Sequence, residues 1–245
     1  MPGTRERMRA TPARWRESRS LPSLGERPAS RRLGAHAPPP MPPRPPALRL
    51  LALGDSYTIG EGVAPPERWP ERLAAALRAE GHALGPPEIV AVTGWTVEDL
   101  GAGVERAALS GPFDLVTLLI GVNDQYDGRR WAALRDGYAA RLGEAVALAG
   151  GDAGRVVCLS IPDWGATPRG AADARGPHGI AAEVDALNAA ERALALAAGA
   201  AWVDITPLSR EQGDAVVADG LHPDGRAYAA WTERVLPAAR AALTR

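Results

Sequence analysis

The chain of 245 residues contains no lysine, because all 28 of its basic residues are arginine. It therefore has neither a Walker A phosphate loop, whose lysine contacts nucleotide phosphates, nor a lysine for Schiff-base chemistry. Its single cysteine, Cys158, excludes an intramolecular disulfide, so the fold needs no oxidising compartment. Cys158 lies in the apolar run Val156–Leu159, where we expect a small, buried side chain.

Long apolar runs are also missing. No stretch approaches the roughly 20 residues that a membrane-spanning helix needs, and the arginine-rich N-terminus lacks the apolar centre of a secretory signal. We therefore expect a cytoplasmic protein without a membrane span. Four scattered histidines and one cysteine provide no ligand cluster, so no metal and no cofactor are expected. The net charge of −1 gives no reason to expect a nucleic-acid partner.

Residues 1–47 differ in composition from the rest of the chain. They hold eleven prolines, ten arginines and three glutamates, and they lack apolar periodicity. This composition predicts a disordered Arg/Pro-rich tail. Two further interpretations stay open: a basic tether, and a true start near Met41 that would make the first residues an artefact of start-codon choice. Residues 48–245 are expected to form one domain.

From Leu48 onward, apolar blocks alternate with helical patterns. The blocks are typical of strands buried on both faces, and they lie at Leu48–Leu53, Glu88–Val92, Leu115–Ile120, Arg155–Ile161 and Ala201–Ile205. The predicted helices are Glu67–Glu80, Val97–Ser110, Arg129–Leu148, Ile180–Ala198 and Asp224–Thr244. This alternation predicts an α/β fold, with a five-stranded parallel sheet covered by helices on both faces. Residues 162–179 are expected to form a long polar loop.

Ligands bind to such a sheet beyond the carboxyl ends of its strands. Ser56 follows the first predicted strand, Gly94 the second, Asn123 the third and Asp163 the fourth. We therefore expect these four residues to lie along one edge of the sheet. Tyr126 and Trp164 lie near the same edge and are predicted to bind substrate, although packing of the loops would also explain both aromatic residues.

Ser56 lies between a strand and a helix beside flexible glycines, where a nucleophile is often presented. A serine nucleophile needs a base, and His222 has an acid, Asp219, three residues before it. That spacing lets the carboxylate hold one imidazole nitrogen while the other faces the serine. The backbone amides of Ser56 and Gly94, with the side-chain amide of Asn123, are predicted to stabilise an oxyanion. Gly94 and Asn123 would also be ordinary at a strand end and in a turn.

Four segments together resemble the motif blocks of the SGNH (GDSL) hydrolases. They are Gly54-Asp55-Ser56, Gly94, Gly121-x-Asn123-Asp124 and Asp219-x-x-His222-Pro223, in the order of that family. The resemblance implies a three-layer α/β/α flavodoxin-like fold, with Ser56 as nucleophile, His222 as general base and Asp219 orienting it. It also implies an oxyanion hole of Ser56, Gly94 and Asn123, and cleavage of carboxylic esters or thioesters without a metal. Tyr57 departs from the pattern, because many members have a smaller aliphatic residue there.

The predicted function is serine-dependent hydrolysis of a small-molecule carboxylic ester, with short acyl groups favoured because no long apolar lid segment is evident. An acyltransferase, a thioesterase or a lysophospholipase would use the same three residues, and these alternatives stay open. So does a non-catalytic binding module of the same fold. A nucleotide-binding module is disfavoured, because Gly54, Gly60 and Gly62 do not have the G-x-G-x-x-G spacing. The sequence makes no prediction about oligomeric state.

Overall fold

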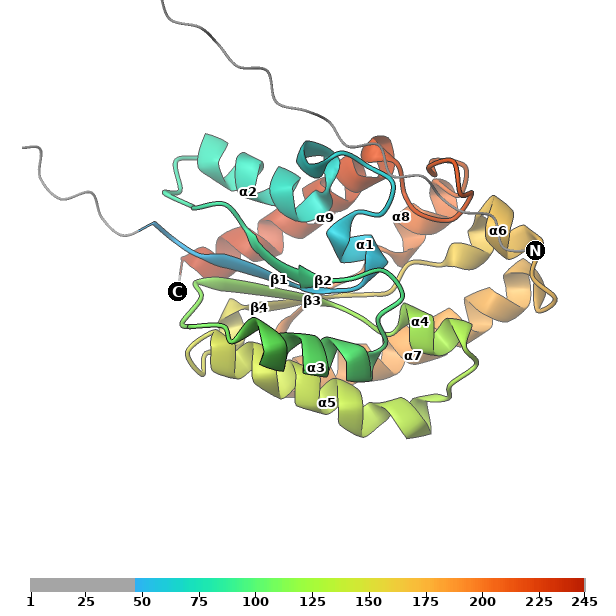
Figure 1. Ribbon diagram of the computed structural model, residues 1–245, viewed down its shortest axis with the longest axis horizontal. Helices are drawn as coiled ribbons and strands as arrows, with labels where there is room; N and C mark the ends of the chain where they lie inside the picture. The colour runs from blue at the N-terminus through green and yellow to red at the C-terminus, as the bar shows by residue number, and fades with distance from the viewer. Residues whose placement is uncertain (1–46, 245) are drawn as a thin grey trace, which may run out of the picture. The chain divides into compact units, whose positions relative to one another are not determined.

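The computed structural model describes residues 47–244, so the predicted tail up to residue 46, including Met41, lies outside the described residues. Five strands form one all-parallel sheet in the order β2-β1-β3-β4-β5 (Figure 1). They are β1 (Leu50–Gly54), β2 (Glu88–Ala91), β3 (Leu115–Leu119), β4 (Val156–Leu159) and β5 (Ala201–Val203). Each strand lies within a predicted apolar block or extends one residue beyond it, which confirms the five-stranded parallel sheet.

The three central strands, β1, β3 and β4, are buried along their whole length. This burial explains why they form continuous apolar blocks instead of alternating patterns. β1 pairs with β3 from Leu50 opposite Leu115 to Gly54 opposite Leu119. The two strands therefore end at the same level, and the turns that follow them begin side by side.

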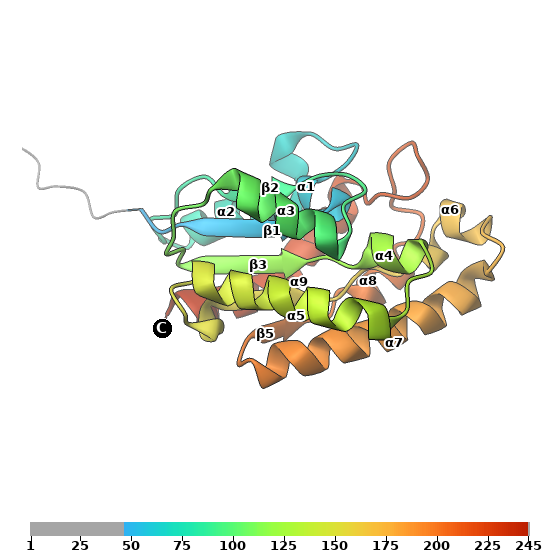
Figure 2. The same cartoon turned by 60° about the horizontal axis from the view of Figure 1, so that its bottom comes forward.

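Five long helices cover the sheet in two layers. They are α2 (Trp69–Ala79), α3 (Val97–Ala107), α5 (Trp131–Leu148), α7 (Gly176–Ala197) and α9 (Gly225–Leu243). α2 and α9 lie on one face, and α3, α5 and α7 lie on the other (Figures 1 and 2). The predicted three-layer α/β/α architecture is thereby confirmed. None of the helices within residues 47–244 is long and apolar enough to cross a membrane.

Several short helical turns were not predicted. The short α-helices are α1 (Ser56–Ile59), α4 (Val122–Tyr126), α6 (Pro168–Ala171) and α8 (Thr206–Glu211). The 3-10 turns are η1 (Pro65–Glu67), η2 (Ala153–Arg155) and η3 (Trp164–Ala166). The α-helices have only four to six residues, so they contain too few turns for an apolar repeat to appear in the sequence.

The expectation of one long loop at residues 162–179 is wrong. This segment forms η3, α6 and the beginning of α7. The side chain of Asp163 caps η3 through Gly165 N–H, and that of Thr167 caps α6 through Gly170 N–H, with Pro168 at the first position of α6. These are ordinary start signals for short helices, and they keep the segment close to the sheet edge.

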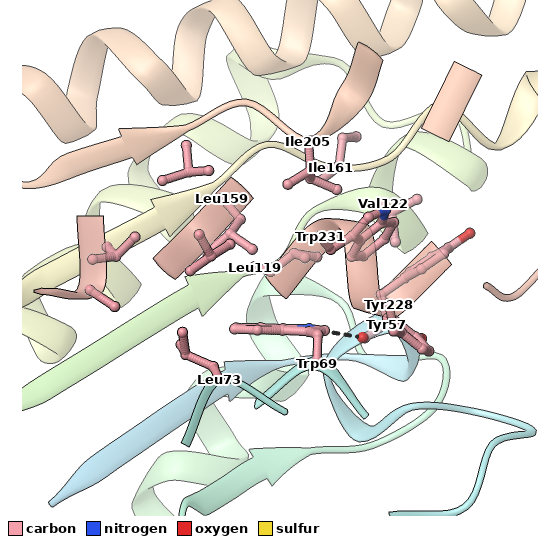
Figure 3. Packing of buried hydrophobic residues seen from close by; sticks show 14 of the residues in the cluster. Tyr57, Trp69, Leu73, Leu119, Val122, Leu159, Ile161, Ile205, Tyr228 and Trp231 are labelled. Atoms are coloured by element: carbon pink, nitrogen blue, oxygen red, sulfur yellow. Dashed lines mark hydrogen bonds between the residues drawn. The ribbon is translucent and has the colours of Figure 1, made fainter. Parts of the chain in front are cut away.

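An aromatic cluster supports the turn after β1. Trp69 donates its indole N–H to the Tyr57 carbonyl at 3.1 Å, and the Tyr57 and Trp231 rings stack with centroids 6.2 Å apart (Figure 3). Tyr228 meets Trp231 edge to face at 5.4 Å. Tyr57 is thus a core residue that joins α1 to α9, and this packing accounts for its size at a position where the resemblance leads one to expect a smaller side chain.

We predict that Gly54→Ala destabilises the protein. A Cβ at this position would lie 2.1 Å from Thr58 Oγ1 and 2.5 Å from the Leu119 carbonyl oxygen, which is backbone and cannot move away. Overpacking of this kind costs about 1–3 kcal/mol, and urea denaturation measures it. Gly143→Ala is the control, because nothing lies within 4 Å of a Cβ there. Equal stability of the two variants would contradict the prediction.

Candidate functional site

Ser56 is the first residue of α1, directly after β1, and only 2% of its surface is exposed. The preceding Asp55 caps the helix by accepting a hydrogen bond from Tyr57 N–H at 3.0 Å. Gly60 ends the helix in the left-handed conformation with φ of 72°. Amides in the first turn of a helix have no acceptor within the helix, so the Ser56 N–H is available to a ligand.

His222 lies in a tight turn held by its own acid. Its Nδ1 is 2.6 Å from Asp219 Oδ2, and Asp219 Oδ1 accepts the backbone N–H groups of Leu221 and His222. The imidazole ring faces Tyr57, with ring centroids 5.2 Å apart, so the His222 turn packs against the residue next to Ser56. The structure thus brings Asp219 into contact with His222 and places the His222 ring against Tyr57, the residue that follows Ser56.

The charge on Asp219 is favoured by this turn. Partial burial of the carboxyl opposes ionisation, but the hydrogen bonds from the His222 ring and from two backbone amides outweigh burial and lower the pKa of Asp219. An ionised Asp219 accepts a hydrogen bond from Nδ1–H and so holds the imidazole in one tautomer. The other ring nitrogen, Nε2, is then free to act as a base.

Asn123 and Gly94 lie on two turns that are joined by hydrogen bonds. Asn123, in α4, donates its side-chain Nδ2–H to the Trp95 carbonyl at 2.9 Å, and Asp124 accepts Val97 N–H at 2.8 Å. An amide nitrogen carries two protons, so one proton of Asn123 remains for a ligand. Gly94 is exposed with φ of 84°, a conformation that side chains disfavour.

The two predicted substrate-binding aromatics are neighbours in different environments. Tyr126 and Trp164 have ring centroids 5.0 Å apart. Trp164 is buried and donates its indole N–H to Gln125 Oε1 at 2.6 Å, whereas 40% of Tyr126 is exposed. Arg169 reaches the Tyr126 hydroxyl at 3.4 Å. Tyr126 is therefore the member of the pair that presents a surface to solvent.

A small, mostly apolar pocket lies beside the His222 turn. Its walls include Tyr57, Trp164, Leu221, Pro223 and Trp231.

Trp95, the third aromatic near the predicted edge, is half-buried and lies against Gly103 of α3, with Arg106 over its ring.

Three buried acids beneath these turns were missed at the level of sequence: Asp55, Asp124 and Glu191. Glu191 had a detectable signal. It occupies the apolar stripe of α7, at helical spacing between Leu187 and Ala195, where a carboxyl is unexpected. Asp55 and Asp124 belong to the motif blocks of Ser56 and Asn123, but no apolar repeat around them indicates that they are buried.

The profile of the GDSL-like Lipase/Acylhydrolase family matches residues 52–230, which is more than half of the chain. The chain belongs to this family. As a member it is an esterase or acylhydrolase, which confirms the predicted enzyme class at that level. The matched range contains Ser56, Gly94, Asn123, Asp219 and His222. A comparison with curated proteins finds no matching relative.

Three solved structures with the same fold illustrate the likeness. TesA is 24% identical with a TM-score of 0.62, and the alignment covers 80% of this chain and 99% of TesA. The psychrotrophic esterase EstA from Pseudoalteromonas sp. is 16% identical with a TM-score of 0.59 over 80% of this chain and 99% of EstA. The acetylxylan esterase Axe2 from Geobacillus stearothermophilus is 20% identical with a TM-score of 0.57, over 78% and 94% respectively. At these identities the likeness concerns the fold.

We predict a pH-dependent stability that originates at Asp55 in this GDSL-like hydrolase. Burial raises the pKa of Asp55 from 3.8 to about 7, against the hydrogen bond from Tyr57 N–H. Between about pH 4 and pH 7 the folded state therefore keeps a proton that the unfolded state has lost, so the free energy of unfolding should fall as pH rises.

Asp55→Asn should reduce this fall, because asparagine cannot ionise and caps helices equally well. Urea denaturation of both proteins across the same pH window measures the effect. An unchanged pH dependence in the variant would refute the prediction.

Proposed function

We propose that the protein hydrolyses carboxylic esters through an acyl-enzyme on Ser56, with His222 as general base and Asp219 as the carboxylate that orients it. The observation that carries the proposal is the His222 turn. Its Nδ1 is 2.6 Å from Asp219, and its ring packs against Tyr57, the neighbour of Ser56. With Nδ1 engaged, Nε2 is the nitrogen left to take a proton from the Ser56 hydroxyl.

The reaction has two stages. Ser56 Oγ attacks the ester carbonyl while His222 Nε2 takes its proton, and a tetrahedral intermediate forms. The bond to the alcohol then breaks as the imidazolium returns that proton to the leaving oxygen. Water attacks the acyl-enzyme with His222 again as base, and the acid leaves as Ser56 regains its proton. Asp219 stabilises the imidazolium in both stages.

The developing oxyanion would be held by three N–H donors: the amides of Ser56 and Gly94 and the side chain of Asn123. Support comes from the contacts of their turns, since Asn123 and Asp124 each hydrogen-bond the segment after Gly94. Donors fixed before the reaction need no reorganisation in the transition state, and one such donor is worth about 10²–10³ in kcat.

The proposed acyl group is short. Among the described residues the exposed large hydrophobic side chains are Val92, Tyr126 and Leu196. The segment beside Tyr126 carries the exposed Arg169 and small residues of α6, so it offers no apolar cover. A long acyl chain gains about 0.8 kcal/mol per methylene only where an apolar surface receives it.

We predict that Ser56→Ala keeps the fold and lowers kcat by about 10⁴- to 10⁶-fold, because the acyl-enzyme cannot form. Hydrolysis of p-nitrophenyl butyrate measures activity, and labelling by a fluorophosphonate reports the nucleophile directly. Ser110→Ala is the matched control, since Ser110 is an exposed serine in the loop after α3. Near-normal hydrolysis by Ser56→Ala would disprove the assignment.

A second prediction concerns chain length. kcat/KM should fall by about tenfold or more between acetyl or butyryl esters and a dodecanoyl ester, since the apolar pocket beside the His222 turn is too small to receive the added methylenes. A p-nitrophenyl ester series measures this directly. A rise in kcat/KM with chain length would exclude the short-acyl assignment while leaving the nucleophile intact.

Addition of a sugar or alcohol acceptor to the same assay separates hydrolysis from acyl transfer. Release of the free acid as the main product is expected. Formation of a new ester at the expense of the acid would identify an acyltransferase.

A further inference from the structure

Three carboxyl side chains lie buried beneath the turns that carry Ser56 and Asn123. Asp55 and Asp124 are 0% exposed and Glu191 is 1% exposed. Arg129 reaches Asp124 at 3.4 Å from a side chain that is 45% exposed, and no other ion pair to the three acids occurs within residues 47–244. Nor do any three acidic, histidine or cysteine side chains of this part converge as metal ligands. Protonation of one of these carboxyl groups would reduce the negative charge that is buried here.

Strand pairing brings the turn that carries Asp55 next to the turn that carries Gly121. β1 and β3 end with Gly54 opposite Leu119, so the segments that lead to Asp55 and to Gly121 begin side by side. Neighbouring strands are about 4.8 Å apart. The Glu191 side chain packs against the second of these turns, because its Oε1 lies 2.7 Å from the place that a Cβ on Gly121 would occupy.

Two of the three acids, Asp55 and Glu191, each have a buried oxygen that lacks a partner. Asp55 Oδ2 and Glu191 Oε2 are both buried without a hydrogen bond. Two ionised carboxylates would only accept hydrogen bonds, whereas a carboxylic acid donates one. Burial raises the pKa of Glu191 well above its usual range, and the charges of Asp124 and Asp55 raise it further. The other titratable groups facing Glu191 are Tyr138 and Cys158, whose pKa values are also raised, chiefly by burial.

We propose that Glu191 is a positioning residue that acts in its protonated form. Its Oε2–H donates toward Asp55 Oδ2, directly or through one water, and so ties the turn of Ser56 to the turn of Asn123. The proton stays within the pair and is not passed to the substrate. The inference rests on the proposed function, because these two turns carry the proposed nucleophile and two of the three proposed oxyanion donors.

The proposed hydrogen bond between Glu191 and Asp55 would affect catalysis through the position of Gly121. Gly121 is the cap residue before α4, with φ of 117°, and Asn123 follows two residues later. A shift of the Gly121 turn moves the Asn123 side chain relative to Ser56, and a displacement of about 1 Å at a reacting centre can cost 10²-fold in rate. Substrate binding at the surface would be little affected, so kcat should respond and KM should not.

Two substitutions of similar length test the role of the proton. Glu191→Gln keeps a neutral hydrogen-bond donor, and kcat should stay within about threefold of wild type. Glu191→Met keeps length and burial without a donor, and kcat should fall by about tenfold or more at little-changed KM, as expected for one lost hydrogen bond. Thermal unfolding midpoints measure loss of folding separately. Equal kcat in the two variants, at wild-type level or below it, would overturn the proposal.

Infrared difference spectroscopy tests protonation without any turnover. The wild-type spectrum minus that of Glu191→Gln, at a pH of about 8 where ordinary carboxyls are ionised, should contain the C=O stretch of a carboxylic acid. A carboxylate band in its place would show that Glu191 is ionised and would overturn the proposal.

Failure of this inference is distinguishable from failure of the proposed function. If the wild type neither hydrolyses esters nor reacts with a fluorophosphonate, the Ser56 mechanism fails, whatever the infrared result. If the wild type is active and Glu191→Met is as fast as Glu191→Gln, only the positioning role fails.

Discussion

The parallel pairing of β1 with β3 is the constraint on which the candidate site depends. Its backbone hydrogen bonds lie in the middle of the sheet, where both strands are fully buried and a shift in register would expose apolar side chains. Because the pairing runs to Gly54 and Leu119, two turns that are far apart in the sequence begin next to each other. The Ser56 turn and the Asn123 turn are thus aligned by backbone geometry, before any side chain of the site makes a contact.

The turn after β1 is too short to be stable by itself. α1 has four residues, fewer than an isolated helix needs, so its shape depends on the Asp55 cap and on the aromatic residues beneath Tyr57. The same turn lies near the buried carboxyl groups of Asp55, Asp124 and Glu191, which have few positive charges around them. Packing on one side of the Ser56 turn therefore offsets an electrostatic cost on the other, an arrangement that is common where a site is built for chemistry.

The sequence predicted the parts of the fold that follow from long apolar patterns. Strands and long helices were recognisable because their burial repeats over many residues, as in Leu115–Leu119 and α5. Short elements such as α6 were missed, since caps and prolines act on too few residues to form a repeat. Of the candidate site, the Asp219–His222 contact was predictable from a spacing of three residues. The environment of Glu191 was not predictable, because it depends on three segments that meet only in the folded chain.

The packing of α9 against the Ser56 turn has a consequence for biosynthesis. Trp231 stacks on Tyr57, and Arg240 near the end of the helix pairs with Glu80 after α2. A chain leaving the ribosome therefore releases all five strands, the last ending at Val203, before the His222 turn and α9 emerge. The nascent sheet would exist for a time without the proposed base, His222, and without the helix that packs against the Ser56 turn. Competence for hydrolysis should accordingly appear late, when the final helix docks.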